Sequence, residues 1–129
     1  RFNKKRIALP CLSLATDTSV ITAAGNDIHF NKIFSRQIEG IGEEGDLFIA
    51  ISTSGNSKNI INALKVAKKK NIYTFGIFGN KGGFAKKFCE NYFSITENNP
   101  SKVQEIHIIF YHLFCQMIEN KLPGNKVHR

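Results

Sequence analysis

The feature that most constrains the fold is an unbroken apolar run, Leu47 to Ile51, which reads Leu-Phe-Ile-Ala-Ile. A strand with one face in water alternates polar and apolar residues, whereas a parallel strand covered on both faces is continuously apolar. A serine-rich loop and a segment with helical periodicity follow the run directly. The run therefore predicts a central strand of a parallel sheet.

The remaining elements are predicted from the spacing of apolar residues and from glycine and proline. Spacings of three and four indicate helices over three ranges: 30–41, 58–70 and 101–122. The other segments are assigned as follows: an edge or irregular strand over 7–14, which contains Pro10; a loop over 16–27; strands over 72–78 and 92–95; a turn over 79–83; and a short helical turn over 84–88.

Strands that alternate with helices imply an α/β fold with a doubly wound, mainly parallel sheet flanked by helices and joined by right-handed crossovers. A length of 129 residues with 42% hydrophobic content fits one core. We expect one domain over 1–122 and a basic tail over 123–129, because Pro123 and Gly124 end the last helix. Sheets of this kind bind ligands at the carboxyl ends of their strands.

Composition limits the partners and the compartment. No run approaches the roughly 18 apolar residues of a membrane span, and three widely separated cysteines are typical of reduced thiols, so we expect a soluble, cytoplasmic protein without a membrane partner. A net charge of +8 would attract nucleic acid. The lysines, however, cluster where helices are expected to end, and the phenylalanines are not interleaved with arginine. We therefore expect no nucleic-acid partner.

The loop after the apolar run is the first candidate site. Free backbone N–H groups at a helix N-terminus favour a phosphate dianion, and hydroxyls beside them add hydrogen-bond donors. Four hydroxyl residues lie there: Ser52, Thr53, Ser54 and Ser57. No Walker-type sequence is present, so the expected ligand is a phosphate monoester. An ordinary turn, in which Ser54 or Ser57 caps the next helix, is the alternative.

Helix 101–122 carries the second polar group, on an otherwise apolar segment. Ser101 and Gln104 fit a capping box, in which Gln104 would only bond the helix end. Gln104 and His112 diverge by about 80° and lie ~12 Å apart along the axis, so one metal ion meets both only if the side chains converge or other subunits contribute. In the loop 16–27, Asp27 follows Gly25-Asn26 and fits a turn cap.

Several separated segments together resemble the phosphoheptose isomerases of the sugar isomerase (SIS) domain superfamily, whose fold is Rossmann-like. The resemblance covers 9–121 and includes Gly25-Asn26-Asp27, Ser52-Thr53-Ser54-Gly55-Asn56-Ser57, and Gln104-Glu105-Ile106-His107 followed by His112. The serine string is typical of the whole superfamily. Its combination with Gln-Glu-Ile-His and a second histidine is more specific.

The resemblance implies roles for these residues. Ser52, Thr53, Ser54 and Ser57 would bind the phosphate of sedoheptulose 7-phosphate, and Asp27 and Gln104 would contact the substrate. Gln104 and His112 would be zinc ligands, with His112 also the catalytic acid/base. The implied reaction is an aldose–ketose isomerisation to D-glycero-D-manno-heptose 7-phosphate for bacterial surface polysaccharide such as lipopolysaccharide or capsule, carried out by a homotetramer.

The resemblance also implies parts that these 129 residues do not contain. Family members carry an upstream third with an Asn-Gly-Gly-Ser loop, a zinc-ligand histidine and a catalytic glutamate. We therefore expect a partial, N-terminally truncated SIS domain with little isomerase activity by itself. The alternative functions are a non-catalytic SIS-domain binding or assembly protein and a phosphosugar sensor.

Overall fold

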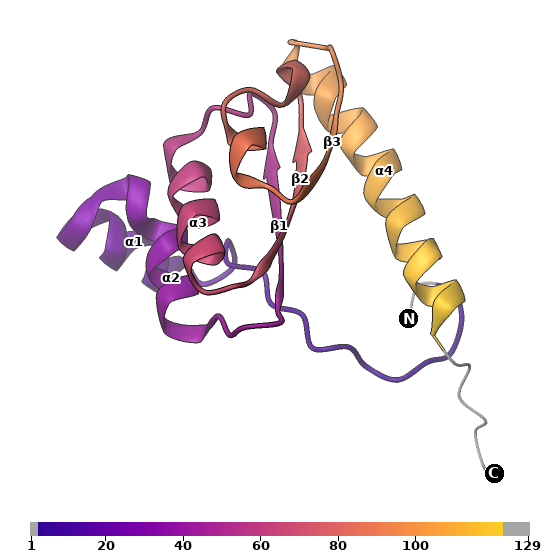
Figure 1. Ribbon diagram of the computed structural model, residues 1–129, viewed down its shortest axis with the longest axis horizontal. Coiled ribbons are helices and arrows are strands. Elements are labelled where there is room, and N and C mark those ends of the chain that lie inside the picture. Colours follow the sequence, from indigo (N-terminus) through magenta and orange to yellow (C-terminus); the bar gives the residue numbers. More distant parts are fainter. Residues whose placement is uncertain (1–2, 123–129) are drawn as a thin grey trace.

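The computed structural model describes residues 3–122 and has three layers (Figure 1). Helices α1 (Thr18–Ala24), α2 (Ile33–Ile41) and α3 (Lys58–Lys69) lie on one side of a sheet, and α4 (Pro100–Lys121) lies on the other. The strands are β1 (Leu47–Ser52), β2 (Tyr73–Phe78) and β3 (Asn91–Ser94). Four short helical turns complete the order: η1 (Gly25–His29), η2 (Phe30–Lys32), η3 (Asn80–Gly82) and η4 (Ala85–Phe88).

The three strands are parallel and lie in the order β1-β2-β3. Their last residues are in register, because Ser52 is aligned with Phe78 and Phe78 with Ser94. The loops that leave the strands therefore begin at one edge of the sheet. The α/β prediction of a parallel sheet with helices on both faces is confirmed.

The prediction that residues 47–51 form a central strand is wrong for the part of the sheet that residues 3–122 build. β1 lies at the edge of that sheet and β2 is in the middle. Helix α4 packs on β2 and β3, where Phe110 stacks on both Phe75 and Phe93. The apolar side chains of β1 on this face stay exposed: Leu47 50%, Ile49 36% and Ile51 48%. Periodicity shows that both faces of β1 are apolar, but not which neighbours cover them.

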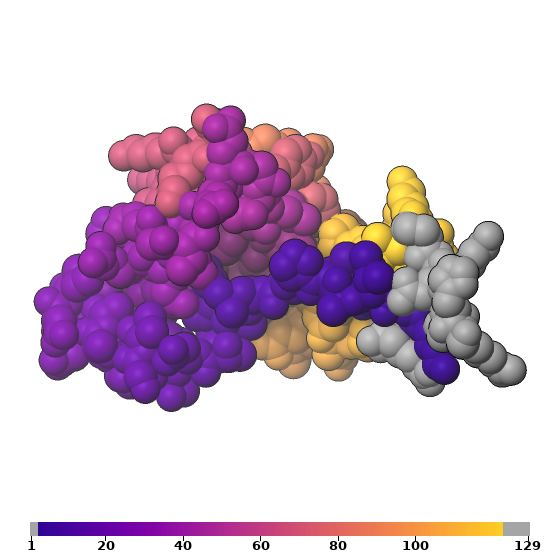
Figure 2. Space-filling model, turned by 90° about the horizontal axis from the view of Figure 1, so that it is seen from below, coloured from indigo at the N-terminus to yellow at the C-terminus, as the bar shows by residue number. Residues whose placement is uncertain are grey.

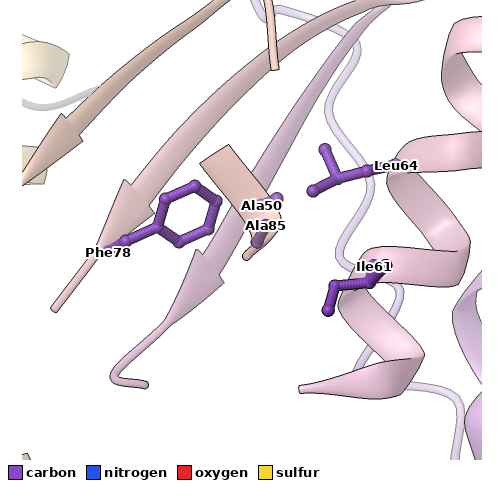
Figure 3. Packing of buried hydrophobic residues seen from close by; sticks show 5 residues of the cluster. All are labelled: Ala50, Ile61, Leu64, Phe78 and Ala85. Atoms are coloured by element: carbon purple, nitrogen blue, oxygen red, sulfur yellow. The ribbon is translucent and has the colours of Figure 1, made fainter. Parts of the chain in front are cut away.

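The main core lies between the sheet and α3. Its buried side chains point toward one another from β1, β2, α3 and η4 (Figure 3): Ala50, Ile61, Leu64, Phe78 and Ala85. Leu64 and Phe78 are each 0% exposed, and burial of such a side chain contributes about 1.5–3 kcal/mol. Because Phe78 is the last residue of β2, this core extends to the carboxyl edge of the sheet.

The N-terminal part differs from two predictions. No strand forms over 7–14; the segment is an exposed strip between the α1–α2 region and α4 (Figure 2). The residues before this segment contact the end of α4, where the Asn3 N–H donates to Glu119 Oε2 at 2.6 Å. The segment 16–27, predicted as a loop, is helical from Thr18 onward, because Asp17 is a helix N-cap whose Oδ1 accepts from the Val20 N–H at 3.1 Å. The predicted tail, 123–129, lies outside the described residues.

No helix within residues 3–122 combines the length and the apolarity that a membrane crossing requires.

Candidate phosphosugar site

The loops that follow the three parallel strands are joined to one another at the carboxyl edge of the sheet. The Gly79 N–H donates to the Ser52 carbonyl at 3.2 Å, which ties the end of β2 to the end of β1. The Ile95 N–H donates to the Phe78 carbonyl at 3.1 Å, and the Asn80 N–H donates to the Glu97 carbonyl at 3.0 Å. The serine loop thus stands at the edge where sheets of this class bind ligands.

The serine loop, residues 52–57, is held by its own hydroxyl groups. Ser52 Oγ accepts from the Gly55 N–H at 3.1 Å and lies 3.1 Å from Ser57 Oγ, with which it shares a hydrogen bond. Ser54 Oγ accepts from the Asn56 N–H at 3.1 Å. Ser52 is 7% exposed, so its hydroxyl serves the inside of the loop. These bonds make the loop a preformed turn.

Close backbone packing fixes the loop against the segment after β2. Gly55 has φ +63°, and a Cβ on it would overlap the Gly82 carbonyl and lie 2.8 Å from the Gly83 nitrogen. The Ala85 N–H donates to the Gly55 carbonyl at 2.8 Å, and the Phe84 N–H donates to Asn56 Oδ1 at 2.9 Å. The left-handed φ and the close approach both require glycine at position 55.

Helix α3 begins at the end of this loop with open backbone donors. Ser57 is in the N-cap position, but its side chain makes no capping bond, since its hydroxyl meets Ser52 instead. Within residues 3–122, no acceptor meets the N–H groups of Lys58 and Asn59. Such donors, together with the helix dipole, favour an anion. Ser57 thus occupies the N-cap position that the capped-turn alternative gives it, but its side chain does not make the capping bond.

A hollow of about 280 Å³ opens beside the loop. It is lined by five residues from the three connected loops and the start of α4: Thr53, Ser54, Asn80, Asn98 and Pro100. The sequence did not single out three of these residues, Asn80, Asn98 and Pro100, although they lie between β2 and β3 or between β3 and the start of α4. The hollow is large enough for part of a sugar phosphate, and its lining offers hydroxyl and amide groups.

Helix α4 starts earlier than the capping box requires. Its N-cap is Asn99, whose Oδ1 accepts from the Ser101 N–H at 3.1 Å, and Pro100 occupies the first turn. The predicted capping box of Ser101 and Gln104 is wrong, because Ser101 lies inside the helix. Gln104 and His112 are both exposed, and the His112 ring meets the Tyr111 ring edge-to-face at 5.2 Å.

The predicted site residues lie in three separate places. The serine loop is one unit, whereas Gln104 and His112 lie on α4 and Asp27 lies in η1, where its Oδ1 accepts from Asn26 Nδ2 at 2.8 Å. Over residues 3–122, no group of three or more His, Cys, Asp or Glu side chains could hold a metal ion. A catalytic zinc takes three protein ligands. The described residues alone therefore do not fit a zinc site.

His107 is a polar residue at this edge for which the sequence predicted no role. It is 3% exposed on α4, facing the sheet. Burial lowers the pKa of its imidazole below the ordinary value, and a hydrogen bond to the backbone of Phe78 partly offsets this effect. Its place four residues after Val103, on the same helix face, is the sequence signal that indicates burial.

The chain is similar to curated phosphoheptose isomerases. It is 45% identical over 122 residues to that of Aliarcobacter butzleri, covering 95% of this chain and 65% of the relative. It is also 45% identical over 128 residues to that of Sulfurimonas denitrificans, covering 99% of this chain and 66% of the relative. The chain thus spans about two thirds of the length of these relatives.

Solved structures agree with the sequence comparison. A phosphoheptose isomerase from Neisseria gonorrhoeae superposes with a TM-score of 0.81 at 35% identity, covering 83% of this chain and 61% of that chain. One from Francisella tularensis superposes with a TM-score of 0.86 at 31% identity, covering 90% and 62%. The sequence profile of the SIS domain matches residues 1–79, which include the whole serine loop. The chain therefore belongs to the SIS domain family.

Proposed function

We propose that this chain acts in a phosphoheptose isomerase, which converts sedoheptulose 7-phosphate to D-glycero-D-manno-heptose 7-phosphate. The observation that carries the proposal is the preformed serine loop with open N–H groups at the start of α3. The similarity to phosphoheptose isomerases over almost the whole chain supports the same substrate. The product would supply heptose for bacterial surface polysaccharide.

The proposed role of the loop is to anchor the phosphate. The hydroxyls of Thr53, Ser54 and Ser57 and the N–H groups of Lys58 and Asn59 would donate to its oxygens, while Ser52 holds the loop in shape. A phosphate fixed at this point leaves the carbon chain to extend along the hollow beside Thr53 and Asn98. Fixing one end of a flexible substrate lowers the entropic part of the reaction barrier.

The proposed chemistry is proton transfer through an enediol. One group removes the proton from the carbon beside the carbonyl, and a second group moves protons on the oxygens. We assign the second role to His112, because an imidazole both gives and takes protons near neutral pH. Asp27 and Gln104 would bind hydroxyl groups of the sugar.

We propose Gln104 and His112 as two of the ligands of a zinc ion. These two side chains leave a catalytic zinc short of the three protein ligands that it needs, so the other ligands would have to come from outside residues 3–122. Zinc bound there would polarise the substrate carbonyl. No step above depends on it.

Assembly and location are further parts of the proposal. We propose a homo-oligomer, a tetramer by resemblance to the family, and the exposed apolar row Leu47, Ile49 and Ile51 on β1 supports an assembled state. We place the protein in the cytoplasm, where its three free cysteines, Cys11, Cys89 and Cys115, would stay reduced. Light scattering on the purified chain tests the oligomer.

The test of the proposed function compares binding with turnover. Sedoheptulose 7-phosphate and unphosphorylated sedoheptulose are titrated into the chain, and product formation is then followed with and without zinc. We expect binding of the phosphorylated sugar only, and a loss of any turnover in His112→Ala with binding retained. Equal binding of both sugars would contradict the assignment of the loop to phosphate.

Phosphosugar binding without turnover is the second candidate function. It is favoured by the separation of the two groups, since the loop is complete while the α4 residues do not form a metal site among residues 3–122. A sensor or binding module would bind the phosphorylated sugar with zinc present and convert none of it. Conversion that is lost in His112→Ala would exclude this candidate.

A further inference from the structure

The hollow beside the serine loop contains an asparagine to which the proposed function gives no part. Asn80 is one of the five residues that line it. Its backbone groups are both used, because its N–H donates to the Glu97 carbonyl at 3.0 Å and its carbonyl accepts from the Gly83 N–H at 3.1 Å. Its side-chain amide has no hydrogen-bond partner among residues 3–122. The amide is therefore the polar group that Asn80 offers to a ligand in the hollow.

The backbone at Asn80 has an uncommon conformation. Asn80 begins a turn of four residues that all have positive φ: Asn80 (47°), Lys81 (54°), Gly82 (86°) and Gly83 (51°). Most side chains clash with the backbone in this left-handed region, and asparagine is one of the few that tolerate it. Lysine is not among them, so Lys81 adds strain. Strained residues of this kind persist where their surroundings hold them, and they gather at ligand sites.

Contacts on two sides hold this turn. On one side, the Lys81 N–H donates to the Ile95 carbonyl at 2.9 Å, which ties the turn to the segment after β3. On the other side, a Cβ on Gly83 would lie 2.6 Å from the Gly55 carbonyl oxygen, so the turn packs directly on the serine loop. The backbone of Asn80 is therefore fixed between the serine loop and the segment that leads to α4.

The lining of the hollow fits an uncharged polyol. None of its five residues carries a charge, and four of them have hydroxyl or amide side chains: Thr53, Ser54, Asn80 and Asn98. An amide both donates and accepts hydrogen bonds, as the hydroxyl groups of a sugar do, whereas a second anion would be held best by a cationic side chain. A sugar whose phosphate lies on the loop would therefore place its nearest hydroxyl groups in suitable surroundings.

We propose that Asn80 is a specificity-determining residue of the phosphosugar site, whose amide bonds a hydroxyl group near the phosphate end of the sugar. The inference rests on the proposed function and deepens it. The left-handed turn fixes the backbone from which the amide extends, so less conformational freedom is lost on binding. The phosphate lies on the serine loop and does not depend on Asn80. Asn80 thus distinguishes a phosphosugar from free phosphate.

The test measures the affinity of the full chain for sedoheptulose 7-phosphate and for inorganic phosphate and compares the ratio of the two. Asn80→Gly removes the amide, while glycine adopts the left-handed φ without a clash. We expect the affinity for the phosphosugar to fall at least fivefold and the affinity for inorganic phosphate to stay within twofold of the wild type. The urea midpoint should stay close to that of the wild type, so the loss does not come from unfolding.

Lys81→Gly is the matched control, because it makes the same backbone change one residue later, at a residue that does not line the hollow. The lost positive charge would affect both ligands alike, so the ratio of the two affinities should stay within twofold of the wild type. An unchanged ratio in Asn80→Gly would overturn the inference, as would an equal fall of the ratio in Lys81→Gly.

The wild-type chain separates this inference from the proposed function. Equal affinity of the wild type for the two ligands would overturn the inference and leave the phosphate loop in place. A wild-type chain that binds neither ligand would overturn the proposed function and this inference with it.

Discussion

The serine loop and the outer side of α4 carry the two halves of the proposed chemistry, and they are built in different ways. In the loop, Ser52 bonds the Gly55 N–H and Ser57, and Gly55 rests against Gly82. On α4, Gln104 and His112 are exposed, and the helix is held on the sheet mainly by its opposite face. In the loop, the same residues would therefore determine both stability and phosphate binding. On α4, the residues that would bind the sugar and the residues that stabilise the helix lie on opposite faces.

The strongest challenge to the loop half is Gly55→Ala. We expect a loss of about 2–4 kcal/mol in the free energy of unfolding, because the substitution combines a left-handed φ with overpacking against Gly82. Urea denaturation measures it. Gly45→Ala is the matched control, since Gly45 also has a left-handed φ, +90°, but nothing lies within 4 Å of a Cβ there. Equal losses in the two variants would show that close packing does not hold the loop.

Ser52→Ala tests the coupling of stability and binding within the loop. It leaves the buried Gly55 N–H without an acceptor, which costs about 1–3 kcal/mol, and it frees Ser57 to move. We expect phosphate to bind about tenfold more weakly, which corresponds to roughly 1.4 kcal/mol. Thr53→Val, whose hydroxyl has no partner among the described residues, should change the unfolding free energy by less than about 0.5 kcal/mol. Comparable destabilisation of both variants would contradict this account.

The sequence predicted the loop better than it predicted α4 or the sheet order. The strand Leu47–Ser52 and the helix after it follow from local periodicity, and so does the place of the loop between them. The position of β1 at the edge depends on which strands pair with one another. The periodicity of apolar residues does not show this pairing. The N-cap of α4 is Asn99 and not the predicted Ser101. An asparagine immediately before a proline is as good a helix start as the predicted capping box, so the sequence alone does not distinguish the two.

His107 is buried on α4, and its pKa predicts a pH dependence. Burial lowers the pKa in the folded state below the ordinary value, so the unfolded chain binds a proton more readily. His107 thus contributes stability that is fully present above a pH of about 6.5 and is lost as pH falls toward the lowered pKa of the folded state. Urea midpoints between pH 8 and pH 5 should fall more steeply for the wild type than for His107→Leu. Parallel curves would show that His107 titrates alike in both states.

The smallest effect on stability is expected on the exposed side of α4. Gln104→Ala and His112→Ala should each change the unfolding free energy by less than about 0.5 kcal/mol, because both side chains are exposed. Inorganic phosphate should bind these variants as it binds the wild type. Thermal denaturation and phosphate titration check both points. A loss of phosphate affinity in either variant would contradict the proposal that the loop binds phosphate independently of Gln104 and His112.

The central claim is that the serine loop binds phosphate by itself, and amide chemical shifts in solution test it most directly. Inorganic phosphate is titrated into the isotopically labelled chain while the backbone N–H signals are followed. The account predicts the largest shifts at Gly55, Lys58 and Asn59, with little change along α4 beyond residue 107. Shifts centred instead on the lysines at 68–70, or none at the loop, would contradict it.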